Sequence, residues 1–91
     1  MVHLSARVHG RVQGVFFRYF VSDLAKEAGL VGYVRNLPSG DAVEVQAEGD
    51  KQELEKLVEK LKKGPPGARV DRVEISWSEC SGQFSSFGIR Y

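Results

Sequence analysis

The sequence predicts an α+β fold in which two helices pack on one face of a mainly antiparallel sheet. Apolar residues recur at the spacing of an amphipathic helix in two segments, one beginning near residue 16 and the other after residue 50. In the segments around these helices apolar and polar residues alternate, which is typical of strands with one buried face. Turn residues separate the segments, so the predicted order is βαββαβ with a short extra strand at the C-terminus.

Length and composition are those of a small globular protein. The chain has 91 residues, so we expect a single domain spanning residues 1–91. Its 13 basic and 12 acidic residues give a formal net charge of +1, which favours neither nucleic acid nor an anionic membrane as a partner. Cys80 is the single cysteine and excludes an internal disulfide. No apolar run approaches the ~20 residues of a membrane span, and the N-terminus does not resemble a signal peptide, so we expect a cytoplasmic monomer.

The first half of the chain contains three of the predicted strands and one helix. Alternating residues from Val2 to Val8 predict the first strand, and residues 10–14 a loop. The first helix is expected over residues 16–28, with one apolar face made of Phe17, Phe20, Val21, Leu24, Ala25 and Ala28. Gly29 stands where a glycine commonly ends a helix. "LVGYVRN" predicts the second strand, "LPSGD" a turn, and "AVEVQAE" the third strand.

The second helix follows the usual capping rules. Asp50 is expected to cap it, and Glu53 to complete a variant of the capping box. Its buried face is predicted to contain Leu54, Leu57, Val58 and Leu61, and "GPPG" at residues 64–67 ends it. Alternating apolar residues then mark a fourth strand (Val73, Ile75, Trp77) and a terminal strand (Phe87, Ile89, Tyr91). This order of elements is that of a ferredoxin-like sandwich.

The first helix breaks the capping rules at its N-terminus. Its cap region is Gln13-Gly14-Val15-Phe16, which has no Ser, Thr, Asp or Asn, and its first turn carries the cation Arg18 instead of an acid. Free N–H groups at a helix start, preceded by a loop with Gly10 and Gly14, can bind a phosphate. Arg18 can hold two oxygens of that phosphate. In the alternative interpretation Arg18 points into water and the helix simply lacks a good cap. The loop is neither a nucleotide P-loop nor a dinucleotide fingerprint, because both glycine patterns are absent.

Two longer motifs make the interpretation more specific. "GRVQGVFFR" (residues 10–18) followed by "GYVRN" (residues 32–36) resembles the acylphosphatase family, whose pattern is G-[RK]-V-Q-G-V-x-[FY]-R and then G-[WY]-V-x-N. The resemblance extends over the whole chain. It implies a hydrolase that converts a small-molecule acyl phosphate to a carboxylate and inorganic phosphate. The resemblance also implies that the enzyme needs neither a metal ion nor a cofactor.

The resemblance also implies which residues act. Arg18 would bind the phosphate, and Asn36 would position the attacking water. The backbone amides of Gln13, Gly14, Val15, Phe16 and Phe17 would surround the same phosphate. The chemistry is self-consistent, because a carboxylate is a good leaving group and needs no protonation, so charge neutralisation and an aligned water suffice. Asn is too weak a base to remove the proton of that water itself.

Other residues have two interpretations each. His9 precedes the loop and is either an extra acid or an exposed strand residue, and we favour the second. Without the family motif, we would favour the interpretation of Asn36 as a residue that is simply common where a strand enters a turn. Cys80 is expected to be structural or incidental, and Phe16, Phe17 and Phe20 to anchor the helix in the core. Whether Tyr33 or Arg35 takes part in the site stays open, and His3 has no functional case.

Two other functional classes remain as alternatives. Some ferredoxin-like domains bind RNA by stacking bases on strand aromatics, but the third strand here has none. The chain is alternatively a non-catalytic, phosphate-binding or regulatory ferredoxin-like module. The presence of both Arg18 and Asn36, with nothing attached to the domain, favours a working enzyme.

Overall fold

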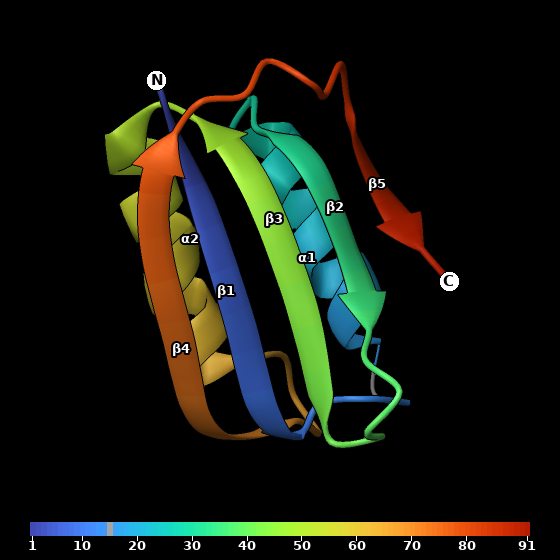
Figure 1. Cartoon of the computed structure of the whole chain (residues 1–91). Helices are drawn as coiled ribbons and strands as arrows, with labels where there is room; N and C mark the ends of the chain where they lie inside the picture. Colours follow the sequence, from blue (N-terminus) through green and yellow to red (C-terminus); the bar gives the residue numbers. More distant parts are fainter. Residues whose placement is uncertain (15) are drawn as a thin grey trace.

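The structure is a computed structural model that describes residues 1–14 and 16–91, and its two helices cover one face of a five-stranded sheet (Figure 1). The elements in chain order are β1 (Val2–Arg11), α1 (Phe17–Glu27), β2 (Val31–Asn36), β3 (Ala42–Gly49), α2 (Lys51–Lys63), β4 (Arg69–Glu79) and β5 (Phe87–Arg90). The strands lie in the order β4-β1-β3-β2-β5, with β5 parallel to β2 and the other neighbours antiparallel. The predicted ferredoxin-like α+β fold with an extra C-terminal strand is confirmed.

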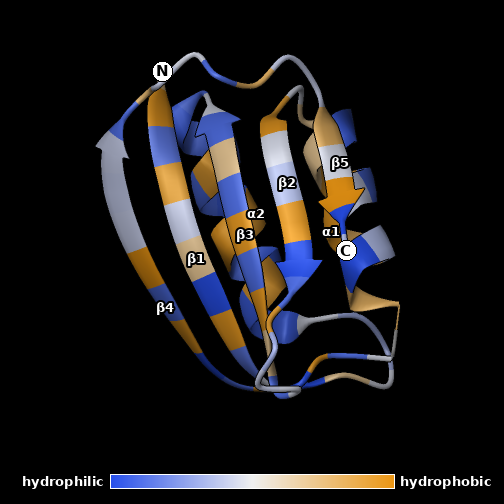
Figure 2. Ribbon diagram, turned by 45° about the vertical axis from the view of Figure 1, so that its right-hand side comes forward, coloured by the Kyte–Doolittle hydropathy of each residue, from blue (hydrophilic) through white to orange (hydrophobic). Residues whose placement is uncertain are grey.

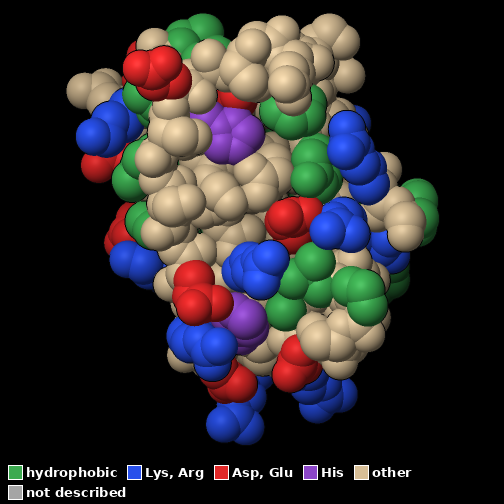
Figure 3. Space-filling model, in the orientation of Figure 1, with side chains coloured by type: hydrophobic (Ala, Val, Ile, Leu, Met, Phe, Trp, Pro, Cys, Tyr) green, Lys and Arg blue, Asp and Glu red, His purple; other side chains and the backbone are tan. Residues whose placement is uncertain are grey.

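The core lies between the sheet and the helices. In the register of β1 and β3, Leu4 pairs with Ala47 and Val8 with Val43, and all four side chains are buried. Apolar and polar residues alternate along these strands in Figure 2, as expected when only one face of a sheet is covered. The opposite face is open and carries acidic, basic and histidine side chains (Figure 3).

Both helices bury the faces that the apolar spacing predicts. Phe17, Val21 and Ala25 of α1 are buried, and the core also contains the four predicted apolar residues of α2. At the start of α2, the Asp50 carboxylate accepts a hydrogen bond from the N–H of Gln52 at 2.8 Å, so the predicted cap is confirmed. The reciprocal half of the capping box is wrong, because the Glu53 carboxylate instead contacts Lys56 at 3.3 Å. No helix in the described part of the chain is long and apolar enough to cross a membrane.

The boundary of β1 differs from the prediction. The strand continues through Gly10 and Arg11, which were expected to lie in the loop, because β4 pairs with both after a bulge between His9 and Gly10. A Cβ atom at Gly10 would lie 2.1 Å from the carbonyl oxygen of Arg69. Gly10 is therefore needed for the close approach of the β4 backbone.

Candidate active site

A pocket of about 170 Å³ lies where the β1–α1 loop meets the end of β2. Among the described residues it is lined by Val12, Gly14, Phe16, Phe17, Arg18, Tyr19 and Asn36. The two residues predicted to act, Arg18 and Asn36, are thus in one pocket although 18 positions separate them in the chain. In Figure 1 the loop after β1, the start of α1 and the end of β2 lie at the same end of the sheet.

The start of α1 supplies backbone donors and a positive field to this pocket. Phe16 is the N-cap residue, no side chain caps the helix, and the first turn contains no acid, as the sequence predicts. The first helical hydrogen bond runs from the N–H of Phe20 to the carbonyl of Phe16, at 3.0 Å. The earlier N–H groups and the helix dipole are therefore available to an anion. Of the predicted loop amides, those of Gly14, Phe16 and Phe17 belong to pocket residues, whereas Val15 lies outside the described residues.

The prediction for the Phe16 side chain is wrong. Its ring is 77% exposed, whereas the ring of the next residue, Phe17, is 1% exposed. Phe16 has a left-handed backbone with φ of 60°, and this conformation interrupts the helical periodicity at the residue where the chain enters α1. The apolar pattern would place the Phe16 ring in the core only if residue 16 were part of the helix. Because Phe16 precedes the helix, the pattern does not apply to it.

Arg18 packs against the C-terminal end of the chain. Its guanidinium carbon lies 4.6 Å from the centre of the Tyr91 ring, which is cation–π geometry. None of the ion pairs between described residues involves Arg18. The contact with the Tyr91 ring therefore does not neutralise the guanidinium, which suits a group that binds an anion.

Strand alternation separates Asn36 from its neighbours. Asn36 shares the helix-facing side of β2 with the buried Val34, and therefore points toward the pocket. Arg35 points to the open face, where its guanidinium contacts the Glu44 carboxylate at 2.6 Å. Tyr33 donates a hydrogen bond to the same carboxylate at 3.1 Å. Neither Arg35 nor Tyr33 lines the pocket, which answers the question that the sequence leaves open.

Gln13 contacts the turn after Asn36. Its side-chain amide donates to the carbonyls of Leu37 at 2.9 Å and Ala42 at 2.8 Å, at the two ends of the β2–β3 turn. Gln13 itself is not among the residues that line the pocket. The side chain therefore ties the β1–α1 loop to the turn that follows Asn36, a role that the sequence does not reveal because it depends on two carbonyls more than 20 residues away.

The remaining titratable candidates lie away from the pocket. The His9 ring contacts the Glu74 carboxylate at 2.5 Å, and this hydrogen bond lowers the pKa of Glu74. This pairing supports the interpretation of His9 as a strand residue. Within residues 1–14 and 16–91, no group of three His, Cys, Asp or Glu side chains is arranged to hold a metal ion.

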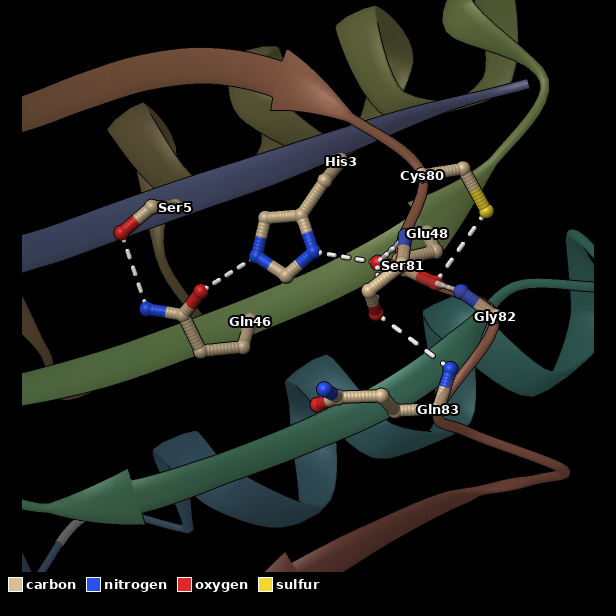
Figure 4. Close-up of polar contacts among 8 residues, drawn as sticks. All are labelled: His3, Ser5, Gln46, Glu48, Cys80, Ser81, Gly82 and Gln83. Carbon is tan, nitrogen blue, oxygen red and sulfur yellow. Dashed lines mark hydrogen bonds and ion pairs between the residues drawn. The ribbon is translucent and has the colours of Figure 1, made fainter.

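A second polar cluster, which the sequence does not predict, lies at the opposite end of the sheet. We call it the Glu48 cluster, and it consists of Glu48, His3, Cys80, Ser81 and Gly82 (Figure 4). The Glu48 carboxylate is 1% exposed and accepts five hydrogen bonds: from His3 Nδ1 at 2.6 Å, from the N–H and the hydroxyl of Ser81 at 2.7 Å each, from the N–H of Gly82 at 3.1 Å and from the thiol of Cys80 at 3.2 Å. The cluster fastens the segment after β4 to the ends of β1 and β3.

Glu48 and His3 are both stabilised in their charged forms within the Glu48 cluster. Burial alone would raise the pKa of Glu48, but the hydrogen bonds from His3 and Ser81 outweigh it and hold this pKa far below its usual range. Burial likewise opposes the charge of His3, but its hydrogen bonds to Glu48 and Gln46 raise its pKa. Gln46 directs its amide NH₂ at Ser5 and Glu44, so its oxygen faces His3 and both ring nitrogens of His3 donate. His3 and Cys80 therefore have structural roles.

Comparisons with known proteins agree over nearly the whole chain. The family model described as Acylphosphatase matches residues 4–89. An acylphosphatase of Dehalococcoides mccartyi strain 195 is 50% identical over 88 residues, which is 97% of both chains. The crystal structure of acylphosphatase from Bacillus subtilis superposes with a TM-score of 0.95 at 38% identity and covers 100% of both chains. The structure of an acylphosphatase from Coxiella burnetii superposes with a TM-score of 0.83 at 39% identity, and the match covers 98% of this chain and 92% of the other.

Proposed function

This chain belongs to the acylphosphatase family and is an enzyme of that family, and we propose that it hydrolyses the carboxyl–phosphate bond of acyl phosphates to a carboxylate and inorganic phosphate. The observation that carries this proposal is the pocket in which Arg18, Asn36 and the uncapped start of α1 meet. We propose further that the catalytic unit is one domain spanning residues 1–91.

Binding of the phosphoryl group is assigned to the β1–α1 loop. Arg18 supplies a planar pair of N–H donors, and the backbone amides of the loop from Gln13 to Phe17 supply further donors. Together with the positive end of α1 they neutralise charge on the equatorial phosphoryl oxygens. The cation–π contact between Arg18 and Tyr91 supports this assignment, because it leaves the charge of the guanidinium available to an anion.

Asn36 is assigned to the water. Its side-chain oxygen accepts a hydrogen bond from a water molecule placed in line with the bond to the acyl oxygen. The water oxygen forms the new bond to phosphorus, the bond between phosphorus and the acyl oxygen breaks, and the carboxylate leaves with the electron pair. The water proton passes to a phosphoryl oxygen, since the amide of Asn36 cannot take it. No metal ion is needed in this scheme, because Arg18 and the loop carry the charge stabilisation.

An assay with a simple acyl phosphate tests the activity. We expect the purified protein to accelerate hydrolysis of benzoyl phosphate in excess chelator, measured as loss of substrate. Hydrolysis at the rate of buffer, with inorganic phosphate still bound, would instead identify a non-catalytic phosphate-binding module.

Two adjacent variants test the role of Asn36. Asn36→Ala should lower kcat steeply, while competitive inhibition by phosphate persists, because Asn36 aligns water and does not hold the phosphate. Arg35→Ala is the matched control, because its side chain lies on the opposite face of β2, and its kcat should remain within about twofold of wild type. Equal loss of turnover and phosphate binding in Asn36→Ala would show that Asn36 supports the loop instead. Melting curves of both variants check that the fold is intact.

A further inference from the structure

Two large aromatic side chains at the pocket are exposed to water. Phe16 is 77% exposed and Tyr19 is 52% exposed, and both line the pocket together with Arg18 and Asn36. Their ring centres lie 6.3 Å apart with an interplanar angle of 49°. At this separation the two rings form one apolar surface beside Arg18.

The backbone of Phe16 adds a second observation. Phe16 is the one residue other than glycine with positive φ among those described, and its φ of 60° is strained for a side chain that is not Gly or Asn. The strain does not serve the core, because the ring points outward. A strained residue that exposes a large apolar ring beside a candidate site is typical of a position used for function.

The chemistry of an acyl phosphate matches this arrangement. The molecule has an anionic end and, two bonds away, an acyl group that varies from a methyl to an aromatic ring. A pocket of about 170 Å³ is smaller than those that enclose a whole organic ligand. With the phosphoryl group at the start of α1, the acyl group must lie across the residues at the rim.

We propose that the rings of Phe16 and Tyr19 form the acyl-binding wall of this enzyme, and that this wall selects acyl phosphates with an aromatic or bulky apolar acyl group over acetyl phosphate. This proposal rests on the proposed function and names its substrate class. Tyr19 lies next to Arg18 in the chain and lines the same pocket, so its ring can contact the acyl group while Arg18 holds the phosphoryl group.

Two variants of Tyr19 and one distant control test the wall by kinetics. The measured quantity is the ratio of kcat/KM for benzoyl phosphate to that for acetyl phosphate. Tyr19→Leu should lower this ratio by about 3- to 10-fold, as expected for loss of one aromatic contact. Tyr19→Phe keeps the ring and should keep the ratio. Phe84→Leu removes a ring that packs near His3 and Tyr33, away from the pocket, and should also keep it.

The variant Phe16→Gly distinguishes the contribution of the Phe16 ring from that of its strained backbone. Phe16→Gly removes the ring and relieves the left-handed strain, so it should lower the ratio without lowering the melting temperature. An equal fall in kcat/KM for both substrates in Tyr19→Leu and Phe16→Gly would overturn the wall, because it would mean that the rings act through the phosphate site. A wild-type protein that shows no preference for the benzoyl group would also overturn it.

Non-hydrolysable analogues distinguish failure of this proposal from failure of the proposed function. Benzoylphosphonate and acetylphosphonate replace the bridging oxygen with a carbon–phosphorus bond, so their binding is measured without turnover. We expect benzoylphosphonate to bind more tightly to wild type and this preference to fall in Tyr19→Leu. This result supports the wall even if neither acyl phosphate is hydrolysed, in which case only the proposed function fails. Equal binding of the two phosphonates to wild type would overturn the wall, whatever the hydrolytic activity.

Discussion

The start of α1 and the Glu48 cluster are opposite arrangements of donors and acceptors. At the start of α1 backbone donors and Arg18 surround a pocket, and no acidic side chain from the described residues lies in that first turn. In the Glu48 cluster one buried carboxylate accepts five hydrogen bonds, two of them from backbone N–H groups. In the first region no acidic side chain of the first turn accepts from the donors, whereas in the second the carboxylate accepts from all five.

The contrast indicates which region is structural and which is functional. A protein can satisfy clustered donors with its own carboxylate, as Glu48 does for Ser81 and Gly82. Leaving donors and a cation unmatched at a helix start destabilises the fold, by about 0.3–1 kcal/mol for a charge of the wrong sign. We infer that this mismatch is kept because a substrate phosphate fills it.

The largest effect is expected when the cation is removed from the first region. Arg18→Ala should lower kcat/KM about 10²- to 10³-fold, because it removes a preorganised donor to the charge of the transition state. Arg18→Lys should recover little of this, since an ammonium lacks the planar pair of donors. Arg90→Ala is a suitable control, because Arg90 also stacks on a tyrosine ring, at 3.9 Å from the centre of Tyr33, but lies outside the pocket. Turnover of Arg18→Ala near that of Arg90→Ala would contradict the assignment of Arg18.

The second effect concerns stability and removes the anion from the Glu48 cluster. Glu48→Gln should lower the free energy of unfolding by about 2–3 kcal/mol, because charge-assisted hydrogen bonds are lost and a new NH₂ group faces existing donors. For a domain of this size, that corresponds to a fall in melting temperature of more than ~10 °C. Its kcat per folded molecule should not change.

An exposed carboxylate provides the comparison for Glu48→Gln. Glu74 is 58% exposed on β4, so Glu74→Gln should shift the melting temperature far less. Equal shifts in the two variants would show that burial of Glu48 does not strengthen its hydrogen bonds.

The third effect supplies the missing anion to the first region. Phosphate should stabilise wild type by RT ln(1 + [L]/Kd), which is ~2.7 kcal/mol at a hundredfold excess over Kd. Arg18→Gln should lose most of this stabilisation, whereas Glu48→Gln should keep it, because its cluster lies at the other end of the sheet. Melting curves with phosphate, and with chloride at equal ionic strength, measure both. A full phosphate shift in Arg18→Gln would contradict the binding site at the start of α1.

The smallest effect is the pH dependence of the Glu48 cluster. The pKa of His3 is raised in the folded protein, so its charge adds stability that is fully present below the unfolded value of ~6.5 and is lost as pH rises through the folded pKa. Glu48 remains ionised throughout this range, because its pKa is lowered. The difference in unfolding free energy between wild type and His3→Gln should therefore decrease as pH rises from ~6.5 through the folded pKa of His3, and the decrease should be small because the ring is partly exposed. A difference that stays constant over this range would show that His3 does not titrate in contact with Glu48.

Local patterns explain why much of this protein could be predicted. Alternating residues in β1, β2 and β3 and the apolar faces of both helices identify the elements, because each pattern reports burial of one side. The missing cap of α1 was equally visible, because capping depends on a few adjacent residues. Alternation along β2 also places Asn36 and Arg35 on opposite faces of the sheet.

The sequence by itself thus determined the α+β fold, its order of elements and the unusual start of α1, since these depend on neighbours within a few residues. Only the tertiary structure decided the burial of Glu48, because the donors that cover it come from residues more than 30 positions away in the chain, on both sides of it. It also decided that Gln13 holds the β2–β3 turn and that the Phe16 ring faces water. Contacts between distant segments and a single left-handed residue leave no periodic pattern in a sequence, so they become visible only when the chain is folded.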